Sequence, residues 1–233
     1  MKNNIISFMF LFIHLSISPT IQFNNPDEML NFVKKFLPVN PVILEAGGRY
    51  GEDTTRMKHV WPQATIHVFE PYPSSFEKVI ENTRSLSRVM AYPYALSNYS
   101  GKTHFYVNHI NEGMCSIGFP APNYAHHFEK TPIEVQCITL NQWSKNYHID
   151  HIDFIWFDME GHELQALQSS LDILYSVKAI YTEVNFVTVR EGSCAYLDLR
   201  HFLEAQGFIE IWKSRDSGEN ADALFVRQEL SSF

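Results

Sequence analysis

Basic residues and cysteines are scarce in this chain of 233 residues, and each shortage excludes a class of function. The 18 Lys and Arg are outnumbered by 26 Asp and Glu, which gives a formal net charge of −8. No basic run is long enough to follow a phosphate backbone, so nucleic acid is not an expected partner. Cys115, Cys137 and Cys194 form no CxxC pair, and their spacing indicates neither a disulfide framework nor a zinc site.

The chain also lacks an apolar run that would comfortably cross a bilayer. Residues 5–17 follow Met1 and Lys2 as a short apolar stretch, and Ser16-Ile17-Ser18 resembles a small-x-small cleavage signal. The pattern is typical of a signal peptide or a membrane tether, and a cytosolic N-terminal segment is the alternative. We therefore expect residues 1–23 to be a hydrophobic leader and residues 24–233 to be one domain. The expected location is cytoplasmic, with a tether or a signal peptide as the open alternatives.

Strand and helix patterns alternate through residues 24–233, which predicts an α/β fold with a parallel, doubly wound sheet. Asn108 to Pro132 interrupts the alternation with a loop longer than compact domains usually contain without a function. A final β-hairpin is expected at Phe208–Trp212 and Leu224–Arg227. The other expected strands are Val42–Ala46, Thr65–Glu70, Val89–Leu96, Thr103–Val107, Ile133–Ile138, Phe154–Phe157 and Lys178–Val184.

One stretch combines a buried strand with a cluster of acids. Four apolar residues, Phe154 to Phe157, are followed at once by Asp158, Glu160 and Glu163. Ligands of open α/β sheets bind at the carboxyl ends of the strands, so this stretch predicts a functional site. Glu163 is expected to cap or to pair within the start of the next helix, which runs through Leu164, Leu167 and Leu171.

A glycine turn follows the first predicted strand. Gly47-Gly48-x-x-Gly51 allows a ligand to approach the backbone closely, but it lacks the GxGxxG spacing and no Walker lysine follows. Dinucleotide and triphosphate binding are therefore poorly supported. Glu45 precedes the turn, where an acid can hold a cationic cofactor. Glu70 ends the next strand, where a carboxylate can accept two hydrogen bonds from a ribose diol.

These motifs, in this order, resemble the FkbM family of S-adenosylmethionine-dependent methyltransferases. The resemblance runs from about Val42 to about Val184 and departs from the family at the first turn, which has Glu45 to Arg49 in place of Asp-x-Gly-Ala-Asn, and at Trp156, where a lysine is usual. It rests on Leu44-Glu45-Ala46-Gly47-Gly48-x-x-Gly51, Val68-Phe69-Glu70-Pro71, Ala95-Leu96-Ser97 with Ser100-Gly101, Ile138-Thr139-Leu140-Asn141, and Asp153 to Glu163.

The resemblance implies the class I methyltransferase fold, a Rossmann-like, seven-stranded, mostly parallel sheet with helices on both faces and a C-terminal antiparallel hairpin. It implies S-adenosylmethionine as cofactor and methyl transfer to a hydroxyl of a sugar or another small molecule. The cofactor contacts that it implies, with Ser116 the more modest candidate, are Glu45, Gly47, Gly48, Gly51, Glu70, Pro71, Ala95, Leu96 and Ser116.

Methyl transfer needs aligned partners and a group that removes the acceptor proton. Asp158 is the leading candidate for this base or for orienting the acceptor, and Glu160 and His162 follow. Alternatively, Asp158, Glu160 and Glu183 hold a divalent cation that lowers the pKa of the acceptor. A catalytically inactive cofactor- or ligand-binding module on the same fold is the main rival function. The sequence indicates no oligomeric state.

Overall fold

The structure is a computed structural model that describes residues 21–215 and 217–231. The apolar run at residues 5–17, with its expected signal or tether, lies outside the described residues. Among the helices that the structure describes, none combines the length and the apolar character needed to cross a membrane.

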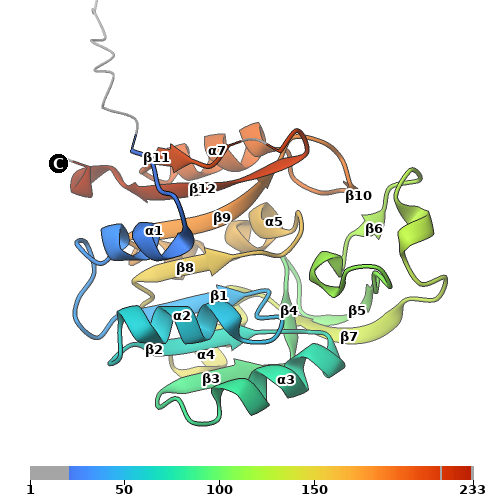
Figure 1. Cartoon of the computed structure of the whole chain (residues 1–233), viewed down its shortest axis with the longest axis horizontal. Helices are drawn as coiled ribbons and strands as arrows, with labels where there is room; N and C mark the ends of the chain where they lie inside the picture. The colour runs from blue at the N-terminus through green and yellow to red at the C-terminus, as the bar shows by residue number, and fades with distance from the viewer. Residues whose placement is uncertain (1–20, 216, 232–233) are drawn as a thin grey trace, which may run out of the picture.

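A seven-stranded sheet forms the centre of the molecule, in the order β11-β12-β9-β8-β1-β2-β3 (Figure 1). The pairs from β9 to β3 are parallel, whereas β12 is antiparallel to both of its neighbours. The predicted α/β fold with a mostly parallel sheet and a C-terminal hairpin is confirmed. The strands are β1 (Val42–Ala46), β2 (Thr65–Phe69), β3 (Val89–Tyr92), β8 (Phe154–Phe157), β9 (Ala179–Asn185), β11 (Phe208–Lys213) and β12 (Asn220–Arg227).

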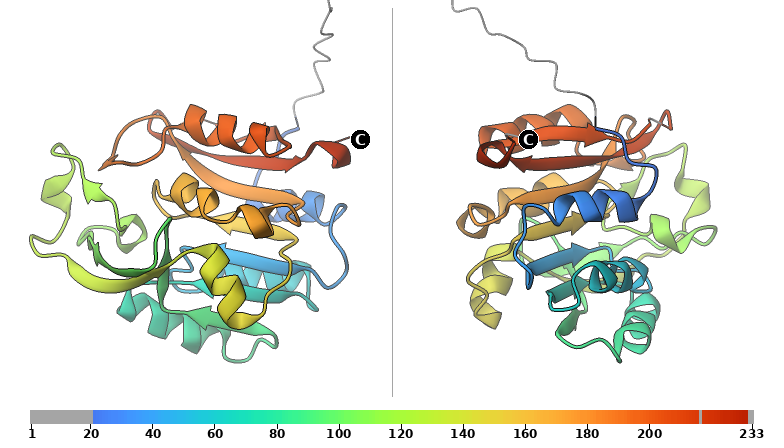
Figure 2. Two further views of the ribbon diagram at one scale, coloured as in Figure 1. Left: turned by 180° about the vertical axis from the view of Figure 1, so that it is seen from behind. Right: turned by 60° about the vertical axis from the view of Figure 1, so that its left-hand side comes forward.

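Helices cover both faces of this sheet (Figures 1 and 2). One face is covered by α1 (Pro26–Val33), α2 (Glu52–Val60) and α3 (Pro73–Thr83), and the other by α4 (Leu140–Tyr147), α5 (Glu163–Gln168), α6 (Leu171–Leu174) and α7 (Tyr196–Ala205). Alternate residues of β8 enter the two cores, because Phe154 packs with Met29 and Met57 while Ile155 packs with Trp143 and Leu167. The strands are therefore buried on both faces, as their continuous apolar sequence predicts.

Local chemistry sets several helix ends. The Asn25 side chain accepts a hydrogen bond from the Glu28 amide at 2.9 Å, and Pro26 stands in the first turn of α1. Thr139 caps α4, because its side chain accepts a hydrogen bond from the Gln142 amide at 3.1 Å. Gly207 follows α7 with a left-handed φ of 82°, as expected for a helix terminator.

Two predicted elements are each divided in the structure. The single strand expected at Val89–Leu96 is wrong, because Pro93 has no N–H to continue the ladder. The chain before it forms β3, and the chain after it forms β4 (Tyr94–Leu96), which belongs to a second sheet ordered β4-β7-β5. The helix expected through Leu164, Leu167 and Leu171 is likewise two helices, α5 and α6, separated at Ser169 and Ser170.

The second sheet and the long loop lie beyond the carboxyl ends of β1, β2 and β8 (Figure 1). The predicted loop from Asn108 to Pro132 contains short elements, among them β6, which pairs in a two-stranded ribbon with β10 from a later part of the chain. Together these parts form a wall opposite the ends of the central strands. The elements of the wall are β5 (Gly101–Phe105), η1 (Glu112–Met114), β6 (Phe119–Pro120), η2 (Ala125–His127), β7 (Ile133–Ile138) and β10 (Arg190–Glu191). The last element, η3 (Gln228–Leu230), follows β12.

Candidate functional site

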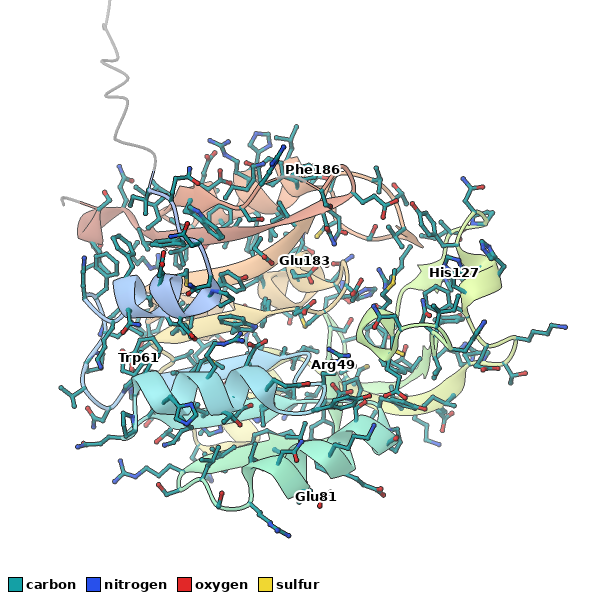
Figure 3. The ribbon with its side chains drawn as sticks, in the orientation of Figure 1. Arg49, Trp61, Glu81, His127, Glu183 and Phe186 are labelled. Carbon is teal, nitrogen blue, oxygen red and sulfur yellow. The ribbon has the colours of Figure 1, made fainter. Side chains whose placement is uncertain are left out.

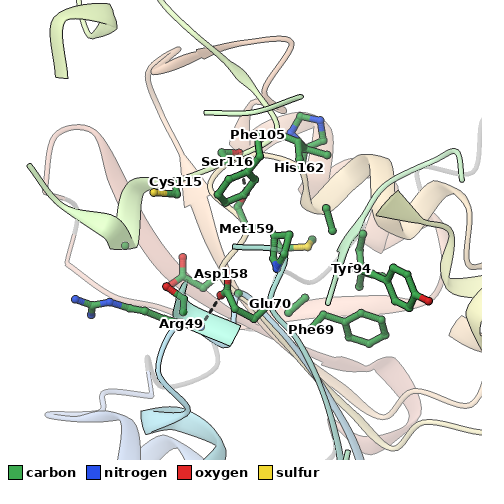
Figure 4. Close-up of a pocket in the computed structure, with 18 of the residues that line it drawn as sticks. Arg49, Phe69, Glu70, Tyr94, Phe105, Cys115, Ser116, Asp158, Met159 and His162 are labelled. Atoms are coloured by element: carbon green, nitrogen blue, oxygen red, sulfur yellow. Dashed lines mark hydrogen bonds between the residues drawn. The ribbon is translucent and has the colours of Figure 1, made fainter. Parts of the chain in front are cut away.

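A cavity opens between the carboxyl ends of the central strands and this wall (Figure 4). Its lining comes from the turn after β1, the end of β2, the second sheet, the η1 segment and the turn after β8. Segments far apart in the sequence therefore meet at the edge where the acids were expected. The sequence-predicted residues that line the cavity are Gly47, Glu70, Pro71, Ala95, Leu96, Ser116, Asp158 and His162.

The glycine turn is held between two neighbouring strands. The Gly47 amide donates to the Phe69 carbonyl at 3.1 Å, and the Asp158 amide donates to the Ala46 carbonyl at 2.9 Å. Gly47 has a φ of 90°, and a Cβ atom there would lie 1.9 Å from the Asp158 carbonyl oxygen. Only glycine fits this turn without movement of the strand ends.

Glu70 lies in the floor of the cavity, with its side chain only 6% exposed. One carboxylate oxygen accepts the Arg49 amide at 2.7 Å (Figure 4), and the other accepts the Tyr72 amide at 2.8 Å. Burial nevertheless raises the pKa of this carboxyl to about 7, although the two amides act in the opposite direction. Each oxygen keeps a lone pair for a ligand hydroxyl, because a carboxylate oxygen can accept two hydrogen bonds.

Asp158 lies across the glycine turn from Glu70, since β8 and β2 flank β1 in the sheet. Its side chain is exposed to the cavity, but surrounding protein limits its hydration. This desolvation raises the pKa of Asp158 well above its usual range, and the nearby charges of Glu160 and Glu163 act in the same direction. A carboxyl with a raised pKa is a stronger base than a free aspartate once it is ionised.

The three candidate metal ligands come together in the structure. One carboxylate oxygen from each of Asp158, Glu160 and Glu183 lies within 4.8 Å of the others. Glu160 also pairs with Arg190 at 2.8 Å, and Glu183 accepts the Asn220 amide group at 2.6 Å. Burial and the neighbouring acids raise the pKa of Glu183 to about 9. Neither Glu160 nor Glu183 lines the cavity itself, so they stand beside it, where Figure 3 shows Glu183 at the end of β9.

His162 lines the cavity at the start of α5. Burial lowers the pKa of its imidazole to about 4, and the positive charge of Arg190 acts in the same direction. The ring is therefore neutral near pH 7. Its Nδ1 atom is buried without a hydrogen-bond partner in the described part of the chain.

Three of the predicted cofactor residues lie outside the lining of the cavity. Glu45 is 1% exposed and accepts a short hydrogen bond from the Thr54 hydroxyl on α2, because strand alternation turns it to the face opposite Ala46. Gly48 packs so closely that a Cβ there would lie 2.3 Å from Val68 Cγ2. Gly51 begins α2 with a φ of 82°. For all three, these contacts indicate a role in shaping the turn, and the expected contact with the cofactor stays a prediction.

Two residues of the stretch from Phe154 to Glu163 have structural roles. The Glu163 carboxylate accepts the amides of Met159 at 2.9 Å and Gly161 at 3.3 Å, so it stabilises the turn that leads into α5. Trp156 is 4% exposed, and its ring lies 4.1 Å from that of Tyr181 in the core. An aromatic pair therefore occupies the layer directly beneath Asp158.

Several cavity residues had not been predicted from the sequence. Arg49, Tyr94, Phe105, Cys115 and Met159 all contribute to the lining. Tyr94 and Met159 are neighbours of predicted residues, so proximity in the sequence was an available signal. Phe105 and Cys115 belong to the second sheet and the loop, and no local pattern marks them.

Two curated proteins are similar to this chain in sequence. The 2-O-methyltransferase NoeI of Sinorhizobium fredii is 27% identical over 200 residues, which cover 82% of this chain and 81% of that protein. The hexuronic acid methyltransferase AglP of Haloferax volcanii is 26% identical over 128 residues, covering 53% of this chain and 48% of that protein.

Among solved structures, the N-terminal domain of EvdMO1, determined with S-adenosylhomocysteine and D-fucose, has a similar fold. The TM-score is 0.52 at 12% identity, and the match covers 89% of this chain and 84% of that one. A profile described as the methyltransferase FkbM domain matches residues 45–210. Since that match spans more than half of the sequence, the chain belongs to the FkbM methyltransferase family.

Proposed function

We propose that this protein transfers a methyl group from S-adenosylmethionine to a hydroxyl group of a sugar. Membership of the methyltransferase family and the likeness to NoeI and AglP, both named as methyltransferases, support the reaction. The names of these two relatives, a 2-O-methyltransferase and a hexuronic acid methyltransferase, support an acceptor of the sugar class.

The observation that carries the proposal is the placement of two carboxylates in one cavity. Glu70 follows β2 and Asp158 follows β8, on opposite sides of the Gly47 turn. Glu70 is thus available to bind the ribose of the cofactor, and Asp158 is available at the end where methyl transfer takes place. Such an arrangement lets a single bound cofactor extend across the end of β1.

The residues present fit S-adenosylmethionine, which supplies an electrophilic methyl group on a positively charged sulfur. Glu70 would accept hydrogen bonds from the ribose hydroxyls. Phe69, Leu96 and Phe105 provide an apolar lining suited to an adenine ring. Asp158 would orient the acceptor hydroxyl and take its proton as the C–O bond forms and the C–S bond to the leaving thioether breaks.

A divalent cation is a second proposal for the same acids, favoured by the observation that oxygens of Asp158, Glu160 and Glu183 lie within 4.8 Å of one another. Bound Mg²⁺ would lower the pKa of the acceptor hydroxyl. In this case, dialysis against EDTA removes methyl transfer and added Mg²⁺ restores it. If EDTA leaves the activity unchanged, Asp158 removes the proton without the help of a metal.

Calorimetry with S-adenosylhomocysteine and an assay with radiolabelled S-adenosylmethionine test the proposed function on the full chain. We expect saturable binding and transfer of label to at least one member of a panel of neutral, amino and uronic acid glycosides. Absence of binding contradicts the cofactor assignment. Binding without transfer to any acceptor favours the inactive binding module instead.

The affinity for the cofactor should depend on pH through Glu70. With a pKa of about 7, this carboxyl is largely protonated at pH 6, and the protonated form has lost acceptor capacity for the ribose. We expect S-adenosylhomocysteine to bind about tenfold more weakly at pH 6 than at pH 8. Calorimetry at the two pH values measures this ratio. Glu70→Gln should bind weakly at both values, and a flat profile for the unaltered protein argues against a contact with Glu70.

We also propose that the domain acts in the cytosol, because its cofactor is cytosolic. Cell fractionation combined with sequencing of the mature N-terminus tests this location. Recovery of a cleaved, exported protein argues against it.

A further inference from the structure

Arg190 in β10 is a charged side chain that is almost completely buried. It is 1% exposed, although it follows a loop and sits in a strand of two residues. A buried guanidinium is costly unless charged and polar partners surround it. Its contacts therefore show which parts of the fold it joins.

The guanidinium contacts two segments that are distant in the sequence. Its Nη2 atom lies 2.8 Å from a Glu160 carboxylate oxygen and donates to the Met114 carbonyl at 2.5 Å. The Phe128 ring lies 6.0 Å from its central carbon. Gly118 gives it room, since a Cβ there would come within 3.0 Å of the Arg190 side chain. One side chain thus links the turn after β8 with the long loop.

Both linked segments also line the cofactor cavity. Gly113, Cys115 and Ser116 contribute from the loop, and Asp158 and Met159 contribute from the turn. A second bond joins the same two segments, because the Ser116 hydroxyl donates to the Met159 carbonyl at 3.3 Å.

The turn needs such support, because its backbone is held in a conformation that side chains seldom adopt. Glu160 has a φ of 59°, in the left-handed region that is unfavourable for a glutamate. The ion pair with Arg190 acts on this strained residue, two positions after Asp158. A shift of Glu160 would therefore also displace Asp158, whose carboxylate lies next to the acceptor hydroxyl in the proposed reaction.

On the basis of the proposed function, we infer that Arg190 is a positioning residue that fixes the wall of the cofactor cavity to the turn carrying Asp158. It acts through Glu160 on one side and through the Met114 carbonyl on the other. It holds the cofactor site and the base in one geometry and does not itself contact the reacting atoms.

Hydrogen exchange on the full chain, without ligand, tests this link independently of activity. Arg190→Met should accelerate exchange at residues 112–120, and Arg190→Lys, which retains the charge, should restore part of the protection. Arg200→Met is the matched control, because Arg200 is 41% exposed and pairs on the surface of α7 with Glu204 at 2.8 Å. It should leave exchange in residues 112–120 unchanged.

Kinetics of the same variants show whether Arg190 supports the chemical step. A double substitution shows whether it does so through Glu160. We expect Arg190→Met to lower kcat by about tenfold or more while the acceptor KM changes less than about threefold. Adding Glu160→Gln to Arg190→Met should not accelerate exchange at residues 112–120 any further, because both changes break one link. If Arg190→Met does not fold, Arg190→Lys and Glu160→Gln are compared in the same way.

Two results would overturn the inference. The first is wild-type exchange at residues 112–120 in Arg190→Met, and the second is a further acceleration of exchange there when Glu160→Gln is added. If the unaltered protein methylates no acceptor, the proposed function fails, whereas the exchange experiment still decides whether Arg190 joins the two segments.

Discussion

Asp158→Asn should reduce kcat for methyl transfer by about 10²- to 10⁴-fold, the range that a general base typically contributes. Asparagine keeps the shape of the side chain but cannot take the acceptor proton. Because the pKa of Asp158 is raised, activity of the unaltered protein should rise with pH as this carboxyl ionises. The affinity for S-adenosylhomocysteine should change by less than about threefold, since Asp158→Asn leaves Glu70 and the glycine turn intact.

Single-turnover rates with radiolabelled cofactor, paired with calorimetry, measure both quantities. Asp150→Asn is the matched control, because Asp150 is exposed in the connection before β8, at the opposite end of that strand. It should retain full activity. If Asp158→Asn retains more than about a tenth of the rate, the base must be another group, and Glu160 and His162 are the next candidates.

Gly47→Ala should have the largest effect on stability. A Cβ at this position would lie 1.9 Å from the Asp158 carbonyl, and the φ of 90° is itself unfavourable for alanine. The turn and the end of β8 must separate to accommodate it. We expect the free energy of unfolding to fall by about 3 kcal/mol or more, with cofactor binding lost. Urea denaturation and calorimetry with S-adenosylhomocysteine check the two effects.

Gly192→Ala separates backbone strain from steric clash. Gly192 has a φ of 76°, but a Cβ there would meet no atom within 4 Å. This variant should lose only about 1 kcal/mol, the cost of a left-handed conformation for a residue with a side chain. Equal losses in the two variants would contradict a steric role for Gly47.

The central fold could be predicted from the sequence, because its signals are local. Continuous apolar runs such as Val42–Ala46 identify strands buried on both faces, and a capping residue such as Thr139 identifies a helix start. The strand through Pro93 was predicted wrongly because apolar pattern alone does not show that a chain leaves one sheet for another. That transfer is decided by pairing with β7, which lies about forty residues later in the chain.

The candidate site was predictable in part, for a related reason. Residues at strand ends, such as Glu70 and Asp158, are placed by the order of the sheet. The direction of Glu45 was not predictable in the same way, because one step along a strand turns a side chain to the other face. The role of Arg190 could not be predicted from the sequence, since its partners, Glu160 and Met114, are 30 and 76 residues away along the chain.

The crowding of acids at the ends of β1, β8 and β9 also couples the fold to proton uptake. The pKa values of Glu45, Asp158 and Glu183 are raised, chiefly by burial, so the folded chain holds protons that the unfolded chain releases. By linkage, this contribution to stability declines as pH rises from the unfolded pKa values, near 4 to 4.5, through the higher folded ones. The ionised Asp158 that the proposed chemistry needs is therefore the form that weakens the native state. We therefore expect a rise in pH to increase activity and to decrease stability. Binding of a positively charged ligand at this edge would reduce the loss of stability.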